Sequence, residues 1–228
     1  MIPIRDDQPS FSTPFINYFL IAVNVLVFFW ELAINVSVGH GALNAVMFQF
    51  GVVPNRAVAL LTGQASGDVS MAILPIFTSM FLHGSFLHVA GNMLFLWIFG
   101  DNVEDYVGHF SYLVLYLTCG VIGGIAHILL NLNSRMPTIG ASGAIAGVMG
   151  AYLILYPRAR VLTWFFIFIV WLPAWLVLGY WFFLQFISIS QIADTGVAVW
   201  AHIGGFAAGV ILIKIFPERP RRYRYATW

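Results

Sequence analysis

Residues 138–156 read TIGASGAIAGVMGAYLILY, nineteen positions without a charged side chain. A helix of about 20 apolar residues is long enough to cross the ~30 Å hydrocarbon core of a bilayer. Small residues recur along the stretch, among them Gly143, Gly147 and Gly150, at spacings that place them on one helix face. Because small residues let helices approach closely inside a membrane, the stretch predicts a transmembrane helix with tightly packed neighbours.

The composition of the whole chain extends this prediction. Of its 228 residues, 61% are hydrophobic and 8% are charged, whereas soluble domains carry roughly 25% charged residues. So few charged groups do not cover a water-facing surface, and the long unbroken apolar runs do not match the short alternating segments of a β-barrel. The sequence predicts an all-α polytopic membrane protein, one bundle of six transmembrane helices. The expected spans are residues 15–34, 76–99, 110–130, 138–156, 161–187 and 197–216.

Basic residues in the flanks predict the orientation, since Lys and Arg concentrate on the cytoplasmic side. With six spans, two basic residues, Arg56 and Arg135, fall on one side. Eight fall on the side that holds both termini, and we expect this side to be cytoplasmic. The eight are Arg5, Arg158, Arg160, Lys214, Arg219, Arg221, Arg222 and Arg224.

The spans also divide the chain into regions. We expect residues 1–14 to form a cytoplasmic N-terminal tail, residues 15–216 the membrane domain, and residues 217–228 a basic cytoplasmic tail. The one long connection, residues 36–75, faces outward and is apolar in part, which predicts a segment lying in the membrane interface. The start of the chain lacks the basic region and cleavage site of a signal peptide, so the first span is expected to be retained.

A serine lies at the outer end of the fourth predicted span, in the sequence Gly140-Ala141-Ser142-Gly143. Small neighbours let a peptide carbonyl reach the hydroxyl, and free amides at a helix N-terminus favour a developing negative charge. The same residues also suit helix packing without any chemistry. Ser142 is therefore a candidate nucleophile, with packing as the alternative interpretation.

A histidine, His202, lies near the outer end of the sixth predicted span. Burial disfavours the charged imidazolium, and a neutral imidazole is what a general base requires. Gly205 and Gly209 follow at a spacing that lets a neighbouring helix approach. The alternative is a core histidine bonded to a backbone carbonyl.

A third polar group opens the second predicted span. His88 and Asn92 are four residues apart and share a helix face. Hydrogen-bond donors that converge on one point stabilise a tetrahedral oxyanion. Interhelical hydrogen bonding is one alternative, and a zinc site that uses His83, His88 and His202 is another. No HExxH sequence or carboxylate partner accompanies these histidines, so no metal is expected.

Other features narrow the possible functions. A net charge of +1, with no dense basic patch outside the C-terminal tail, gives no indication of nucleic-acid binding. The single cysteine, Cys119, cannot form an intrachain disulfide and is expected to be a small buried hydrophobe.

The three polar groups, around Ser142, His202 and His88, lie in different predicted spans but all at the outer end. Because intramembrane polar groups are costly, this common depth indicates a shared cavity that holds water.

Together these motifs resemble those of the rhomboid family of intramembrane serine proteases. The resemblance covers nearly the whole chain as a six-span core. It is carried by three motifs in order, which are His83-x4-His88-x3-Asn92, Gly140-x-Ser142-Gly143 and Ala201-His202-x2-Gly205-x3-Gly209.

The resemblance implies a role for each matching residue. Ser142 would be the nucleophile and His202 the general base, a dyad without an acidic member. His88 and Asn92 would complete an oxyanion hole with the backbone amide of Ser142. The supporting residues would be Gly140, Gly143, His83 and Gly205.

The resemblance also implies what the protein acts on and where. Its partners would be transmembrane protein substrates and the lipid bilayer, and no cofactor would be needed. Trp181 and Phe182 in the fifth span would belong to a lateral gate. The minimal six-span form fits a bacterial inner (plasma) membrane. The oligomeric state is not indicated.

The chain departs from some members of the family. Ala146 occupies the position, one turn after the serine, where some relatives place a tyrosine against the histidine. Another group must therefore orient the His202 ring. Some members of the family also carry a Trp-Arg pair in the loop after the first span, and this chain has no clear counterpart of that pair. The alternative functions are a catalytically inactive rhomboid-like protein that binds transmembrane clients and, less well supported without repeats or mid-membrane carboxylates, a small transporter.

Overall fold

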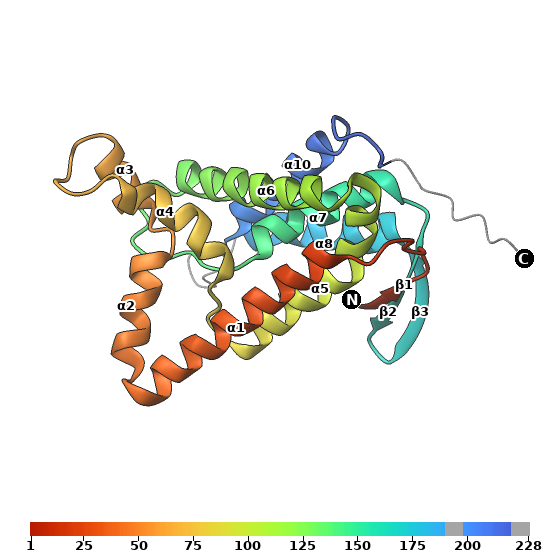
Figure 1. Cartoon of the computed structure of the whole chain (residues 1–228), viewed down its shortest axis with the longest axis horizontal. Coiled ribbons are helices and arrows are strands. Elements are labelled where there is room, and N and C mark those ends of the chain that lie inside the picture. Colours follow the sequence, from red (N-terminus) through yellow and green to blue (C-terminus); the bar gives the residue numbers. More distant parts are fainter. Residues whose placement is uncertain (190–197, 220–228) are drawn as a thin grey trace, which may run out of the picture.

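Helices make up most of the protein (Figure 1), and the computed structural model describes residues 1–189 and 198–219. Arg221, Arg222 and Arg224 of the predicted basic tail lie outside the described residues. The helices are α1 (Phe15–Ser37), α2 (His40–Phe50), α3 (Pro54–Leu61), α4 (Ser70–Thr78), α5 (Phe86–Val107), α6 (His109–Leu130), α7 (Ser142–Leu155), α8 (Ala174–Ile189) and α10 (Val199–Leu212), with a 3-10 turn at Ser79–Phe81.

Two of the described helices, α1 and α6, are long and apolar enough to cross a membrane by themselves. A third candidate is the pair formed by α4 with its 3-10 turn and α5, which meet at a bend of 78°. The helices α7, α8 and α10 are apolar but shorter, and α7 and α10 have 14 residues each. The protein is therefore a helical membrane protein with two or three helices of full spanning length in its described part.

The bend changes the second predicted span. A single helix over residues 76–99 was expected, but the chain becomes extended at Leu82 and α5 begins only at Phe86. The Ser85 hydroxyl accepts a hydrogen bond from the backbone N–H of His88 at 3.2 Å and caps the new helix. This cap places His88 and Asn92 in the first turns of α5.

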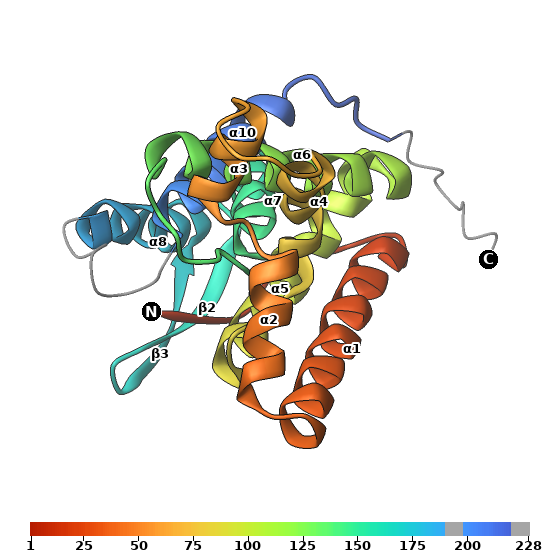
Figure 2. The same cartoon turned by 90° about the vertical axis from the view of Figure 1, so that its left-hand side faces the viewer.

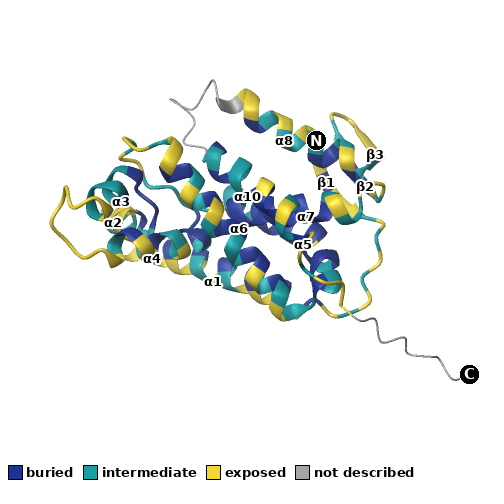
Figure 3. Ribbon diagram, turned by 90° about the horizontal axis from the view of Figure 1, so that it is seen from above, coloured by how far each residue is buried: buried dark blue, intermediate teal, exposed yellow. Residues whose placement is uncertain are grey.

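The helix α7 lies at the centre of the bundle, where buried residues concentrate (Figure 3), and ten of its residues are buried. Its small residues form direct backbone contacts with α10. A Cβ atom added at Gly205 or Gly209 would overlap the carbonyl oxygen of Gly143 or Gly147, respectively. The close packing predicted from residues 138–156 is therefore present, and its partner is α10.

A small antiparallel sheet corrects two expectations. Residues 161–187 do not form one helix, because β2 (Arg160–Phe165) and β3 (Phe168–Pro173) form a hairpin before α8. The segment that was expected to be an N-terminal tail contributes β1 (Ile2–Asp6), which pairs with β2. The reason is local: residues 161–171 are β-branched, aromatic or leucine throughout, a composition that favours strands, and β1 pairs with the outer edge of β2.

Contacts gather several distant segments at one end of the bundle (Figure 1). The pairing of β1 with β2 joins the N-terminus to the α7–α8 connection. Ser12 donates a hydrogen bond to Asp105 at 2.6 Å, and the Arg219 N–H donates to the Tyr106 carbonyl at 2.7 Å. We call this the basic end, because Arg5, Arg158, Arg160 and Arg219 lie there. The helices α2 and α3 lie at the opposite end.

Candidate active site

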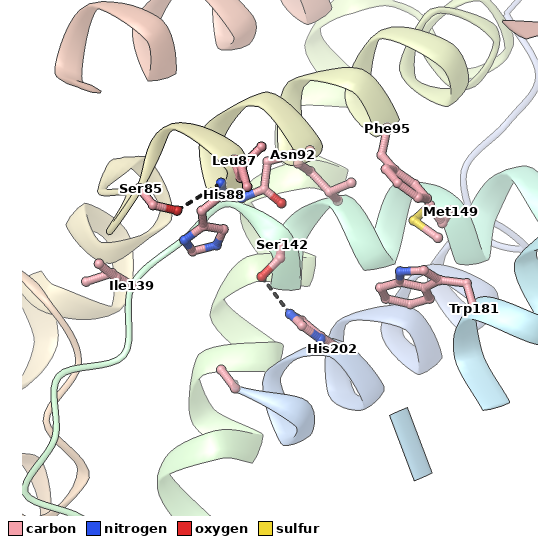
Figure 4. Close-up of a pocket in the computed structure, with 13 residues that line it drawn as sticks. Ser85, Leu87, His88, Asn92, Phe95, Ile139, Ser142, Met149, Trp181 and His202 are labelled. Carbon is pink, nitrogen blue, oxygen red and sulfur yellow. Dashed lines mark hydrogen bonds between the residues drawn. The ribbon is translucent and has the colours of Figure 1, made fainter. Parts of the chain in front are cut away.

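Ser142 and His202 form the centre of the site (Figure 4). The Ser142 Oγ and the His202 Nε2 are 2.6 Å apart, a hydrogen bond between α7 and α10. The glycine contacts between these two helices bring their backbones close enough for the short serine side chain to reach the ring. Both residues are only partly buried, so the pair is accessible from the adjoining cavity.

The cavity beside this pair has a volume of about 490 Å³. It lies between α5 and α8, and residues of α7 and α10 form the rest of its wall. Figure 4 shows the polar residues His88, Asn92 and Ser142 around it, with Met149 and Trp181 at its apolar side. The structure thus brings the polar residues of three predicted spans together, as their common depth indicated.

Gly140 shapes the chain just before the serine. Its φ is +122°, a backbone conformation that favours glycine. A Cβ atom here would also lie 2.7 Å from the His88 Nε2. Both constraints explain why a glycine precedes the serine at this position. The turn places Ser142 as the first residue of α7, where its backbone N–H has no partner within the helix.

His83 holds Asn92 in place. Its Nδ1 lies 3.3 Å from the Phe81 carbonyl and can only donate there, which leaves Nε2 to accept the Asn92 amide N–H at 2.9 Å. The backbone N–H of His83 donates to the buried Glu31 carboxylate of α1 at 3.1 Å. Glu31 is the only carboxylate within the first five predicted spans, and this contact satisfies it. Both nitrogens of His83 are therefore used within the protein.

The second nitrogen of His202 contacts a residue that the sequence motifs did not predict. The His202 Nδ1 lies 2.7 Å from the Gln185 Oε1 of α8. The Gln185 Nε2 donates to the Trp181 carbonyl at 3.1 Å, which fixes the orientation of the amide. Gln185 is 8% exposed. The available signal was an amide in an otherwise apolar run, four residues after Trp181.

The two residues predicted to form a gate have different surroundings. Trp181 lines the cavity, and its ring lies 5.7 Å from that of His202 and 6.5 Å from that of Phe95 on α5. Phe182 stacks on Phe206 of α10 at 4.4 Å and does not line the cavity. Trp181 and Phe95 therefore bridge α8 and α5 across the cavity.

The remaining predicted residues include two glycines and the single cysteine, and the structure shows what each of them contacts. Gly143 and Gly205 contact each other across the α7–α10 interface. Cys119 is fully buried against Gly147. Among residues 1–189 and 198–219, no three His, Cys, Asp or Glu side chains converge as metal ligands would.

Comparison with known proteins identifies the family. Residues 70–219 match the family model of the Rhomboid domain. "Rhomboid protease GluP" of Bacillus subtilis is 32% identical over 211 residues, which are 90% of this chain and 34% of that protein. "Rhomboid protein 1, mitochondrial" of Saccharomyces cerevisiae is 31% identical over 154 residues, 63% of this chain and 42% of that protein.

A mammalian relative gives the same result. The "Presenilin-associated rhomboid-like protein, mitochondrial" of Mus musculus is 31% identical over 123 residues, 53% of this chain and 33% of that protein. The chain thus spans between about a third and two fifths of the length of these three relatives. The matched domain contains α4 to α10 and every residue of the site described above except Glu31. The chain belongs to the rhomboid family.

Proposed function

We propose that the protein is an intramembrane serine protease that hydrolyses peptide bonds in or near the transmembrane segments of other membrane proteins. The observation that carries the proposal is the 2.6 Å contact between the Ser142 Oγ and the His202 Nε2 at the wall of a cavity. A serine that is hydrogen-bonded to an oriented imidazole is the arrangement of an activated nucleophile. The protease name of one relative adds support from the family.

The reaction begins when the His202 Nε2 takes the proton of the Ser142 hydroxyl. The Oγ attacks the carbonyl carbon of the substrate, and a tetrahedral intermediate with a negatively charged oxygen forms. The His202 imidazolium then gives its Nε2 proton to the leaving amine as the C–N bond breaks. A water molecule, activated by the same nitrogen, hydrolyses the acyl-enzyme ester.

The negative oxygen meets three donors. The Ser142 backbone N–H, at the first position of α7, is available for it. The Asn92 amide uses one N–H on His83 and keeps the other for the cavity. The His88 ring lies beside Gly140 on the same wall. Donors held in advance around the developing charge lower the barrier without reorganising during the reaction.

Gln185 takes the role that Ala146 leaves open. Its Oε1 accepts a hydrogen bond from the Nδ1–H of His202. The lone pair of the neutral ring therefore lies on Nε2, toward Ser142. The contact also fixes the plane of the imidazole. Gln185 is a positioning residue, because it acts through His202 and lines no part of the cavity.

We further propose that the fold is a six-span bundle with both termini in the cytoplasm of a bacterium and its domain in the plasma membrane. The short helices α7 and α10 are about 21 Å long at 1.5 Å per residue. They do not reach the full hydrocarbon thickness, which leaves room for a water-filled cavity above Ser142. The segments 1–14 and 217–228 lie on the inner side, and α2 lies in the outer interface.

The substrate reaches the cavity between α5 and α8. Its scissile carbonyl must leave a helical hydrogen bond before it is attacked. Substrates with Gly, Pro or polar residues near the outer end of their transmembrane segment are therefore preferred. The contact of Trp181 with Phe95 has to open to admit the chain.

Cleavage of a fluorogenic transmembrane substrate in liposomes tests the proposal. The wild-type protein is expected to cleave it, and Ser142→Ala and His202→Ala are each expected to lower the rate by several orders of magnitude. Equal rates for the wild type and Ser142→Ala would overturn the proposal. Binding of the substrate without cleavage by the wild type would instead favour an inactive rhomboid-like protein that binds transmembrane clients.

A further inference from the structure

The hairpin of β2 and β3 is apolar along its whole distal half. Residues 164–169, which form this half, read WFFIFI, without one polar side chain. Four of these residues form the tip, and the exposed fractions are 81% for Phe166, 85% for Ile167, 61% for Phe168 and 62% for Ile169. A strand whose two faces are both apolar does not match the half-buried, half-hydrated pattern of a water-exposed hairpin.

The turn at the tip of the hairpin contains a bulky apolar residue with a positive φ. Phe165 pairs with Phe168, so Phe166 and Ile167 form a two-residue turn. Phe166 has a φ of +53°, in the left-handed region where Gly, Asn and Asp are favoured and a bulky side chain is strained. The turn therefore carries an unfavourable aromatic residue in a position where polar residues would fit the backbone better. A requirement for apolar surface at the tip explains this choice.

The placement of the hairpin points to the bilayer as its environment. The strands lie at the basic end and run across the direction of α6 (Figure 1), and the hairpin projects away from the helices (Figure 2). It continues without a gap from Pro173 into α8 at Ala174. The outward face of α8 is also apolar and exposed at Trp175, Phe183 and Phe186. The exposed apolar surface of the hairpin is thus continuous with that of a membrane helix.

Charges and aromatic residues at the base of the hairpin match an interfacial depth. Arg5 lies over the Trp171 ring at 5.5 Å. Arg158 and Arg160 are exposed at the start of β2, and Arg160 pairs with Asp7 at 3.2 Å. Tryptophan and basic residues together are typical of the boundary between acyl chains and headgroups.

We propose that the β2–β3 hairpin is a membrane anchor whose tip, residues 166–169, inserts into the lipid leaflet at the basic end. Among the residues that the structure describes, no strand pairs with the outer edge of β3. Unpaired backbone groups are costly in the hydrocarbon core, so the hairpin lies at interfacial depth and only its tip side chains enter the acyl region. Through Pro173 the anchor holds the inner end of α8, the helix that carries Trp181 and Gln185.

A fluorescent label that reports depth tests this anchor in the full-length protein. Ile167→Cys is labelled with bimane and reconstituted in phosphatidylethanolamine–phosphatidylglycerol vesicles, and Arg160→Cys at the base of the same hairpin is the matched control. The unsubstituted protein shows the background, because its Cys119 is fully buried. We expect nitroxide-labelled lipids to quench the label at position 167 and aqueous iodide to quench the label at position 160. Equal iodide quenching at both positions would overturn the proposal.

A second variant separates lipid from other partners and from misfolding. F166N/I167G places a favoured turn pair at the tip, so the hairpin is expected to keep its fold while it loses apolar surface. A label at Phe168→Cys should be shielded from iodide in the natural turn and exposed in F166N/I167G. Shielding that disappears when the protein is diluted in excess lipid would show contact with a second copy and would contradict lipid insertion. These readouts need no proteolysis, so they stand apart from the test of the proposed function.

Discussion

At the scale of single residues, the site depends on which nitrogen of His202 faces Ser142. The sequence motifs predicted that Ser142 and His202 act together and that His88 and Asn92 lie beside them. The structure brings these four residues to one cavity, and their catalytic roles stay a prediction. The motifs did not predict Gln185, which reaches His202 from another helix. A contact between α8 and α10 has no local spacing, so only the tertiary structure reveals it.

Replacement of the Gln185 amide is expected to slow the chemical step. Gln185→Met keeps the length and volume of the side chain but leaves the His202 Nδ1–H without an acceptor. The loss of one buried acceptor costs about 1–3 kcal/mol, so kcat should fall roughly 5- to 150-fold, while KM for a transmembrane substrate changes little. Gln185→Glu restores an acceptor and should recover part of the rate.

The control for this comparison is the thermal stability of both variants in detergent. A merely structural role predicts that kcat follows stability in the two variants. Equal kcat for the wild type and Gln185→Met would remove Gln185 from the positioning role.

At the scale of elements, the contact between α7 and α10 determines where Ser142 and His202 meet. Small-residue spacing predicted close packing for each helix, through Gly143 and Gly147 in one and Gly205 and Gly209 in the other. That the two helices pack against each other is seen only in the structure. The hairpin was not predicted, because apolar residues that form a strand and apolar residues that form a span look alike in composition. Its pairing with β1 joins residues about 160 positions apart.

Two glycine substitutions are predicted to have opposite effects on stability, one in the α7–α10 contact and one on α8. In Gly209→Ala the new methyl group overlaps the Gly147 carbonyl, and a backbone atom cannot move aside as a side chain can. Overpacking of this kind costs about 1–3 kcal/mol. In Gly179→Ala on α8 the methyl group meets no atom within 4 Å, and the gain in helix propensity is about 0.5–1 kcal/mol.

Thermal denaturation in detergent compares the two. We expect a lower midpoint for Gly209→Ala and an unchanged or higher midpoint for Gly179→Ala. A Gly209→Ala protein as stable as the wild type would show that the two backbones are not in direct contact.

At the scale of the whole molecule, the N-terminus is fastened to the bundle through β1. Tyr152 of α7 donates a hydrogen bond to Asp6 at the end of that strand. The sequence assigned residues 1–14 to a tail because nothing in them alone indicates a partner. The structure places residues 1–14 and the α7–α8 connection at the same end of the bundle, and the cytoplasmic orientation of that end stays a prediction from the basic residues.

The Asp6 contact makes stability depend on pH in a defined direction. Burial raises the pKa of Asp6 from 3.8 to about 6, against a smaller opposing effect of its hydrogen bond with Tyr152. The folded state therefore holds this proton more tightly than the unfolded state. Stability from this group is fully present below pH 3.8 and is lost as the pH rises through about 6.

Asp6→Asn keeps the shape and an acceptor for Tyr152 but does not titrate. We expect the wild type to lose stability as the pH rises through about 6, and the variant to lose less over the same window. Denaturation curves recorded on both sides of that pH measure the difference. Parallel curves for the two proteins would contradict the assignment of this proton to Asp6.

The proposed protease activity depends on an activated hydroxyl at Ser142, and a fluorophosphonate probe measures the reactivity of this hydroxyl directly. After reaction of the protein in liposomes, mass spectrometry of its peptides should find the phosphonyl adduct on Ser142. Labelling should be absent in Ser142→Ala and strongly slowed in His202→Ala. A wild-type protein that stays unlabelled while folded, or one that is labelled equally after Ser142→Ala, would contradict the proposed protease.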